Sequence, residues 1–238
     1  MKILMLNKLK LRRIRMSALV MADKKLLKLK INEIFYSIQG ETTFAGLPTL
    51  FIRLTGCPLR CGYCDTAYAF HVGKMMAITD ILAEVKKYKP QCITVSGGEP
   101  LAQQNVLYLL EQLCDNYTAV SLETSGALDV SPVDSRVVKI LDIKTPGSQM
   151  ASKNMLSNLD YLLPHDQIKF VICNEDDFKW SLDFLAKHNL SARPNILFSP
   201  SYHDMSLQKL AELIIASNAP VRLQAQLHKI IWGDIPGK

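Results

Sequence analysis

The sequence predicts an α/β fold, a partial and open β/α barrel that resembles an incomplete TIM barrel. Short apolar or β-branched segments alternate with longer segments of helical pattern, which indicates a parallel sheet with right-handed crossovers. There are about six such strand–helix units, fewer than the eight of a closed barrel. Polar and glycine-rich residues follow several of the strands, where parallel α/β proteins place their chemistry.

The predicted strands are short segments rich in apolar and β-branched side chains. In chain order they are residues 31–37 (INEIFYS), 49–56 (TLFIRLTG), 92–97 (CITVSG), 118–126 (TAVSLETSG), 137–144 (VVKILDIK), 167–173 (QIKFVIC), 195–200 (NILFSP) and 221–227 (VRLQAQL).

The predicted helices are longer segments with apolar residues at helical spacing. They are residues 78–88 (ITDILAEVKKY), 104–117 (QNVLYLLEQLCDNY), 176–188 (DDFKWSLDFLAKH) and 206–218 (SLQKLAELIIASN). Asp204 or Ser206 is a suitable N-cap for the last of these helices. No low-complexity linker or charge run interrupts this series, so we expect a single domain over residues 31–238.

Polar segments follow five of the predicted strands. They are SGGEP (96–100), ETSG (123–126), DIKTPG (142–147), SPSYHD (199–204) and a three-cysteine loop after residue 56. Because the carboxyl ends of parallel strands meet at one edge of a sheet, we expect these segments to form one pocket.

The net charge of +6 is concentrated in the first thirty residues. Residues 1–30 hold ten Lys or Arg and one Asp, a balance of +9, so the remainder carries −3. We therefore expect no nucleic-acid partner for the folded body. Residues 1–30 are predicted to be a dispensable, poorly ordered extension, with an amphipathic helix that touches a membrane or a partner as the alternative.

The apolar segments are too short for a membrane span, and residues 1–30 lack the apolar core of a secretory signal. We therefore expect a cytoplasmic protein with reduced cysteines. Cys92, Cys114 and Cys173 lie in apolar segments and are predicted to be small buried hydrophobic residues.

Cys57, Cys61 and Cys64 lie within eight residues and need a different explanation. Clustered thiols in a reducing compartment more often bind metal than form disulfides. Structural zinc prefers four ligands, and His71 could be the fourth, but the usual two short ligand pairs are absent. Three cysteines on a four-iron cluster would instead leave one iron open to a substrate or cofactor.

The spacing Cys-x3-Cys-x2-Cys, with Tyr63 before the last cysteine, resembles the signature of the radical S-adenosylmethionine (SAM) superfamily. The segments SGGEP, ETSG and DIK resemble three strand ends of that superfamily's cofactor site. This resemblance implies a [4Fe–4S] cluster on Cys57, Cys61 and Cys64, with S-adenosylmethionine bound to the open iron.

A finer resemblance covers the chain from about Ile31 to its end. The segment NEIFYSIQGETTFAGLPTLFIRLTGCPLRCGYCDT and the ending QLHKIIWGDIPGK are similar to the 7-carboxy-7-deazaguanine synthase family. Members of that family convert 6-carboxy-5,6,7,8-tetrahydropterin to 7-carboxy-7-deazaguanine with loss of ammonia, on the route to queuosine. The resemblance implies a lyase of the radical SAM type.

The resemblance also assigns roles to residues of this chain. Substrate contacts are implied for Ile38, Gln39, Gly40, Arg53, Ser96 and Pro236. S-adenosylmethionine contacts are implied for Tyr63, Cys64, Asp65, Gly98, Asp142, Ile143, Lys144, Ser199, Pro200, Ser201 and Tyr202. Thr66 matches a magnesium ligand, and a hydroxyl suits this hard cation. Gly40 would permit close backbone approach, and His228 is not expected to be catalytic.

Two other functions stay open at this point. A glycyl-radical activating enzyme shares the cysteine spacing, although the chain has no extra cysteine-rich insert. A zinc-stabilised module could instead dock on nucleic acid through the basic N-terminal residues. The family resemblance further implies a homodimer and a flavodoxin-like electron donor.

Overall fold

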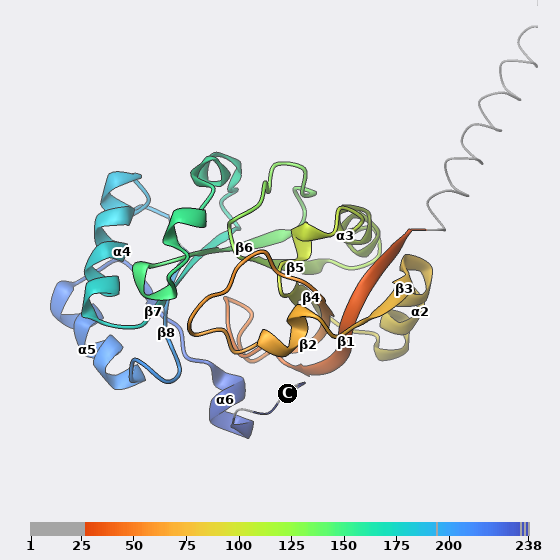
Figure 1. The fold of residues 1–238 in the computed structure, drawn as a ribbon, viewed down its shortest axis with the longest axis horizontal. Coiled ribbons are helices and arrows are strands. Elements are labelled where there is room, and N and C mark those ends of the chain that lie inside the picture. The colour runs from red at the N-terminus through yellow and green to blue at the C-terminus, as the bar shows by residue number, and fades with distance from the viewer. Residues whose placement is uncertain (1–26, 194, 234, 236, 238) are drawn as a thin grey trace, which may run out of the picture.

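The computed structural model describes residues 27–193, 195–233, 235 and 237 (Figure 1). Within these residues, nine strands form one sheet in the order β3-β1-β2-β4-β5-β6-β7-β8-β9. The strands are β1 (Lys28–Ile38), β2 (Pro48–Leu54), β3 (Lys74–Ala77), β4 (Cys92–Gly97), β5 (Ala119–Thr124), β6 (Val138–Ile143), β7 (Gln167–Ile172), β8 (Ile196–Pro200) and β9 (Arg222–Leu223). From β2 to β9 all neighbours are parallel, whereas β1 is antiparallel to both β2 and β3.

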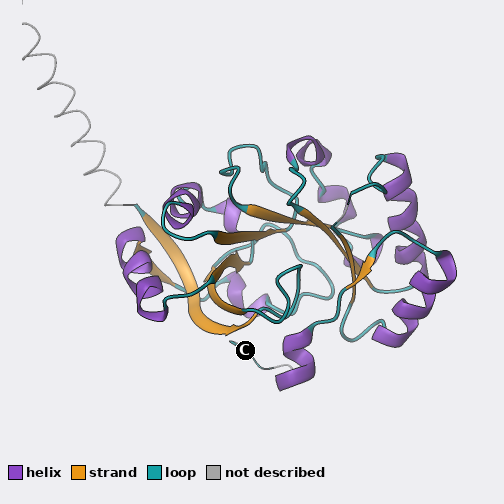
Figure 2. Ribbon diagram, turned by 180° about the vertical axis from the view of Figure 1, so that it is seen from behind, coloured by secondary structure: helices purple, strands orange, loops and turns teal. Residues whose placement is uncertain are grey.

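The α-helices lie around the outside of the curved sheet, except for the last one, which lies near the C-terminus (Figure 2). They are α2 (Ile78–Tyr88), α3 (Val106–Cys114), α4 (Glu175–Lys187), α5 (Leu207–Ser217) and α6 (Leu227–Trp232). Short 3-10 helices occur at Ala67–Phe70 (η1), Pro100–Ala102 (η2), Pro146–Ser148 (η3), Ala151–Lys153 (η4) and Leu156–Tyr161 (η5). The helices α2 to α5 follow β3, β4, β7 and β8 and pack against the sheet, as the crossovers of a parallel sheet require.

Local sequence explains where two of these helices begin and how one packs. In α2 the buried residues are Ile78, Ile81 and Val85, which recur on one helical face. The side chain of Ser206 accepts a hydrogen bond from the Lys209 backbone N–H at 3.1 Å, which confirms Ser206 as the N-cap of α5. Asn174 caps α4 in the same way, through the N–H of Asp177 at 2.9 Å.

The expected partial, open barrel is confirmed, because β3 and β9 are the two ends of the sheet order and do not pair with each other. The predicted strand over residues 221–227 is wrong beyond its start. The strand β9 contains only Arg222 and Leu223, and the chain then enters α6 at Leu227. The short edge strand β3 was not predicted at all.

The folded domain begins earlier than residue 31. Lys28 and Lys30 pair with β3 at Ala77 and Met75, and Leu29 is fully buried. These residues belong to the sheet and not to the expected extension, whereas residues 1–26 lie outside the described part of the chain. Among the described residues, no helix has both the length and the apolar character needed to cross a bilayer.

The turn between β1 and β2 folds back into the barrel. The Gln39 side chain donates a hydrogen bond to Thr94 Oγ1 on β4 at 3.1 Å. The Thr43 N–H donates to Gln167 Oε1 on β7 at 3.0 Å, and Gln167 Nε2 donates to Thr43 Oγ1 at 2.7 Å. Residues 39–43 therefore form the floor of the space that the strands surround.

Candidate active site

A cavity of about 530 Å³ lies at the carboxyl ends of the parallel strands. Each of the five polar segments singled out in the sequence contributes to its walls, and residues 38–42 and α6 contribute from below. The expectation that these strand ends form one pocket is confirmed.

The three-cysteine loop forms the upper wall of the cavity, between β2 and η1. The Cys64 N–H donates to the Cys61 carbonyl at 3.2 Å, and the Gly62 N–H donates to the Ser148 carbonyl at 3.2 Å. Cys57, Cys61 and Cys64 are half-buried, and none of the six cysteines of the chain forms a disulfide. Burial raises the pKa of the Cys57 and Cys61 thiols. A bound metal reverses that effect, since a coordinating thiol is deprotonated.

These thiols suit a polynuclear iron–sulfur cluster by their chemistry and their placement. Thiolates are the standard protein ligands of such clusters, and all three open onto the same cavity. Within the described residues, no three His, Cys, Asp or Glu side chains converge on a point where one ion could sit. The ligands of a four-iron cluster need not converge in this way, because each thiolate binds a different iron.

Glu99 connects the carboxyl end of β4 to the carboxyl end of β5, beside the cysteine loop. Its fully buried carboxylate accepts hydrogen bonds from the Leu101 N–H, Thr124 Oγ1 and the Ser125 N–H at 2.9, 3.0 and 2.7 Å. Glu99 is thereby the N-cap of η2. Next to it, a Cβ on Gly98 would lie 2.2 Å from the Gly56 carbonyl oxygen, so this close approach requires glycine.

Two polar atoms on the cavity wall lack a partner among the described residues. They are Asp142 Oδ1 and the Tyr63 hydroxyl, and both are buried. Lys144 lies between these side chains, with its Nζ 3.0 Å from Asp142 Oδ2 and 5.7 Å from the centre of the Tyr63 ring. Buried polar atoms of this kind normally have a hydrogen-bond partner. This wall is therefore suited to a polar ligand.

The floor of the cavity carries charged groups with opposite pKa shifts. Glu41 forms an ion pair with Lys169 on β7 and accepts a hydrogen bond from Gln226 Nε2 at 2.7 Å. Burial alone would raise the pKa of Glu41, but Lys169 lowers it from 4.5 to about 2. Burial and the nearby Glu41 raise the pKa of Glu123, whose Oε2 accepts from Ser96 Oγ at 2.8 Å.

Helix α6 closes the cavity beside Gly40. The Leu227 N–H donates to the Gly40 carbonyl at 2.9 Å. A Cβ on Gly40 would lie 2.0 Å from His228 Nδ1 and 2.9 Å from the His228 backbone nitrogen. The close backbone approach at Gly40 in the structure is to α6, whereas the predicted approach to a substrate stays a prediction. Burial lowers the pKa of His228, which favours the neutral imidazole.

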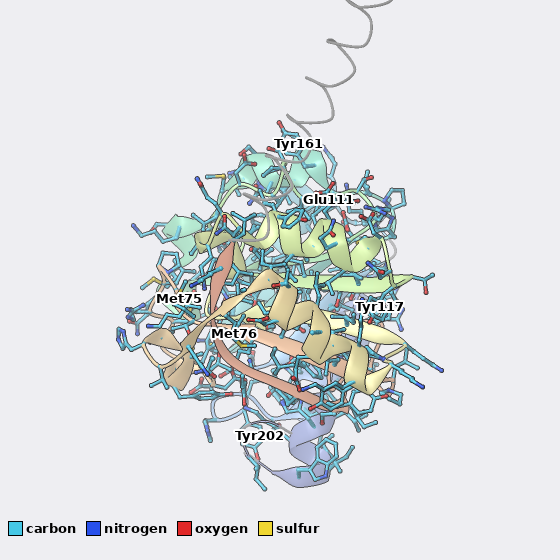
Figure 3. The ribbon with its side chains drawn as sticks, turned by 90° about the vertical axis from the view of Figure 1, so that its right-hand side faces the viewer. Met75, Met76, Glu111, Tyr117, Tyr161 and Tyr202 are labelled. Atoms are coloured by element: carbon cyan, nitrogen blue, oxygen red, sulfur yellow. The ribbon has the colours of Figure 1, made fainter. Side chains whose placement is uncertain are left out.

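The same helix contacts the cysteine loop and the segment after β8. Lys229 Nζ lies 3.4 Å from Asp65 Oδ2 and 4.4 Å from the centre of the Tyr202 ring. Tyr202 lies low in the molecule, near the C-terminal helix (Figure 3). Residues from three distant parts of the chain thus meet at this side of the cavity.

Arg53 on β2 lines the cavity. Its partner in the antiparallel register is Glu33 on β1. Arg53 Nε donates to Glu33 Oε1 at 2.7 Å, and the same oxygen accepts from the Tyr68 hydroxyl at 2.9 Å. The guanidinium carbon lies 5.5 Å from the centre of the Phe35 ring. Phe35 stacks on Phe51 at 4.9 Å, so this part of the wall is aromatic.

Most site residues predicted from the sequence line this one cavity. They are Ile38, Gln39, Gly40, Arg53, Cys57, Cys61, Tyr63, Cys64, Asp65, Thr66, Ser96, Gly98, Asp142, Lys144, Ser199, Pro200, Ser201 and Tyr202. Ile143 does not line it, because its side chain is buried in the core. Pro236 lies outside the described residues.

Sequence reasoning missed Glu33, Glu41, Lys169 and Gln226. One signal was available for Lys169, because strands of a parallel sheet are normally almost continuously apolar. A lysine within QIKFVIC therefore indicates a charged partner or a polar cavity on one face of the strand. The other three residues carry no local pattern of this kind.

Comparison with known proteins places the chain among radical SAM enzymes. A model of the Radical SAM superfamily matches residues 51–143. The 7-carboxy-7-deazaguanine synthase of Chlorobaculum tepidum is 42% identical over 207 residues, covering 86% of this chain and 94% of that protein. The synthase of Koribacter versatilis is 37% identical and covers 86% and 97%.

The fold agrees with a solved structure of the same kind. The crystal structure of QueE from Escherichia coli has a TM-score of 0.71 and 25% identity, and covers 86% of this chain and 96% of that chain. These comparisons do not favour a glycyl-radical activating enzyme or a zinc-stabilised module. Membership of the radical SAM superfamily implies a [4Fe–4S] cluster and S-adenosylmethionine. The chain belongs to the 7-carboxy-7-deazaguanine synthase family.

Proposed function

We propose that the protein converts 6-carboxy-5,6,7,8-tetrahydropterin to 7-carboxy-7-deazaguanine with loss of ammonia. This is a carbon–nitrogen lyase reaction in 7-deazapurine and queuosine biosynthesis. The observation that carries the proposal is the single cavity that joins the three-cysteine loop to the guanidinium of Arg53. The names of the relatives support it, since each is a 7-carboxy-7-deazaguanine synthase.

Cys57, Cys61 and Cys64 would hold the cluster, and the neighbouring strand ends would hold S-adenosylmethionine. Together these cofactors supply the reductive generation of a carbon radical that removes hydrogen from the substrate. Asp142 Oδ1 is available to accept a hydrogen bond from the cofactor, because it has no partner among the described residues. The Lys144 side chain on the same wall is itself buried.

The pterin would lie between the floor and the aromatic wall. The terminal nitrogens of Arg53 suit the substrate carboxylate, because a guanidinium binds carboxylates in a bidentate manner. Phe35 and Phe51 offer apolar surface for a ring system. Ser96 and Gln39 are fixed by Glu123 and Thr94, so their positions are set before a ligand arrives.

Magnesium at Thr66 is a further part of the proposal. Thr66 lines the cavity, and its Oγ1 lies 3.9 Å from Cys64 Sγ. Magnesium prefers oxygen ligands and keeps several waters or substrate oxygens. One protein hydroxyl together with the substrate carboxylate would therefore suffice to hold the ion between the cysteine loop and the pterin.

We also propose a homodimer, a flavodoxin-like electron donor and a cytoplasmic location. A dimer would cover a sheet edge such as β3, where the Met75 side chain is exposed (Figure 3). The half-buried cysteine loop is accessible enough to receive an electron from a partner protein. Six free cysteines suit a reducing compartment.

The test is an anaerobic product assay with reconstituted protein, S-adenosylmethionine, a reductant, magnesium and the carboxytetrahydropterin. We expect 7-carboxy-7-deazaguanine, identified by mass spectrometry. Cys61→Ala should lose both iron and product, since it removes a thiolate ligand. The matched control, Cys92→Ala, alters a buried cysteine outside the cavity and should keep both. A protein that retains iron and binds S-adenosylmethionine but forms no deazaguanine would contradict the assignment.

A further inference from the structure

Glu33 is the partner of Arg53 at the mouth of the substrate pocket. The two residues face each other in the antiparallel register of β1 and β2, so the sheet itself holds their backbones side by side. Glu33 Oε1 accepts hydrogen bonds from Arg53 Nε at 2.7 Å and from the Tyr68 hydroxyl at 2.9 Å. Both side chains of the ion pair are largely buried, with 14% exposure for Arg53 and 26% for Glu33.

The contacts of Arg53 leave one edge of its guanidinium directed to the cavity. Glu33 accepts a hydrogen bond at the Nε edge of the guanidinium. The centres of the Phe35 and Tyr68 rings lie 5.5 and 5.9 Å from the guanidinium carbon. The side chain also lines the cavity. A guanidinium has five N–H donors in a fixed fork, so the Nε edge can bind one carboxylate while the two terminal nitrogens bind another.

Tyr68 connects this pair to the cysteine loop. It lies in η1, two residues after Thr66. Its hydroxyl donates a hydrogen bond to Glu33 Oε1 at 2.9 Å. Glu33 therefore accepts hydrogen bonds both from Arg53, which lines the cavity, and from η1, which follows the cysteine loop.

We infer that Glu33, supported by Tyr68, is a positioning residue that orients Arg53 for the carboxylate of the substrate and thereby sets selectivity for carboxylated pterins. The inference rests on the proposed function, and it adds residues for which no role was expected from the sequence. Without Glu33, the buried cation would lose its only hydrogen-bond acceptor among the described residues and would adopt other rotamers.

The experiment measures equilibrium binding to the reconstituted protein with S-adenosylmethionine and without reductant. Two probes are compared anaerobically, 6-carboxytetrahydropterin and tetrahydropterin without the carboxylate. The wild type should prefer the carboxylated probe. Glu33→Ala should reduce that preference about tenfold, the size expected for a hydrogen bond to a charged group. Affinity for tetrahydropterin should change less than about twofold.

Three further variants separate positioning from a general structural role. Glu33→Gln keeps an oxygen acceptor and should restore most of the preference. Tyr68→Phe removes one hydroxyl and should cause a smaller loss, which keeps the test available if Glu33→Ala does not fold. Arg53→Ala should abolish the preference, and adding Glu33→Ala should then have no further effect. The control is Glu84→Ala, which removes a partly buried carboxylate on α2 that pairs with Lys87 away from the cavity, and it should match the wild type.

The outcomes distinguish this inference from the proposed function. Equal weakening of both probes in Glu33→Ala, or an unchanged preference, would overturn the positioning role. A wild type that forms the deazaguanine but binds both probes equally would also overturn it, while leaving the proposed function intact. A wild type that forms no deazaguanine would contradict the proposed function instead.

Discussion

The Glu41–Lys169 pair is a residue-scale contact whose contribution to stability depends on pH. Both side chains are largely buried, with exposures of 12% and 14%. Because folding lowers the pKa of Glu41 from 4.5 to about 2, the charged pair stabilises the protein fully above about pH 4.5. This contribution is lost progressively as the pH falls through about 2.

Lys169→Met should therefore destabilise the protein by about 3–5 kcal/mol at pH 7, because it leaves a buried carboxylate without its cation. The difference from the wild type should shrink between pH 7 and pH 4, because burial raises the pKa of an unpaired Glu41 above 4.5 and its carboxylate then takes up a proton in this range. Urea unfolding at pH 7 and pH 4 measures both values. Lys87→Met removes an exposed partner of Glu84 and should change little. An equal loss at both pH values would contradict this account.

At the scale of elements, one carboxylate connects α4 to the cysteine loop. Asp177 in the first turn of α4 accepts hydrogen bonds from the Gly147 N–H, Thr145 Oγ1 and the Cys173 N–H at 2.8, 3.0 and 3.0 Å. The turn held in this way presents the Ser148 carbonyl, which accepts from the Gly62 N–H. A helix on the outside of the sheet thus supports the loop that carries the cysteines.

Asp177→Asn should weaken this support, because the amide group loses one acceptor oxygen and is buried beside N–H donors. We expect lower iron retention after reconstitution and a lower midpoint of urea unfolding. Asp176→Asn is the matched control on the same helix, since its side chain is 94% exposed. Iron retention equal to that of the control would show that the turn does not depend on Asp177.

The element boundaries also show where sequence patterns fail. The helix over 78–88 and the strand over 92–97 were predicted with their observed bounds, because amphipathic spacing and a short apolar segment agree with their burial. Residues 221–227 alternate in the manner of a strand, yet β9 stops at Leu223. After it Gln226 extends to Glu41, a tertiary contact that local alternation cannot predict.

At the scale of the whole molecule, the sequence was sufficient to predict the open barrel and the gathering of strand ends at one cavity. Parallel topology places these ends together whatever the loops contain. The floor was not predictable in the same way. Thr43 meets Gln167 across 124 positions, and Glu41 meets Lys169 across 128. Such pairings depend on how the β1–β2 turn folds inward, and no periodic pattern encodes them.

The start of the folded domain gives a prediction at this scale. A chain that begins at residue 27 should keep the stability and activity of the full chain, because β1 and its partners remain intact. A chain that begins at residue 31 loses Leu29, which is fully buried, and the pairing with β3. It should be less stable by at least about 2–5 kcal/mol, the cost of removing one buried leucine. Urea unfolding of both truncated chains tests this, and equal stability would contradict the placement of β1.

The inward turn at residues 39–43 also determines the order in which the molecule can assemble during translation. Glu41 is synthesised early, but Gln226, which donates to it, follows 185 residues later. Long-range contacts form only after the intervening chain exists, and folding begins with the N-terminal part of a nascent protein. The cysteine loop therefore leaves the ribosome well before the substrate floor can close. A newly made chain contains its three-cysteine loop early and completes the cavity last.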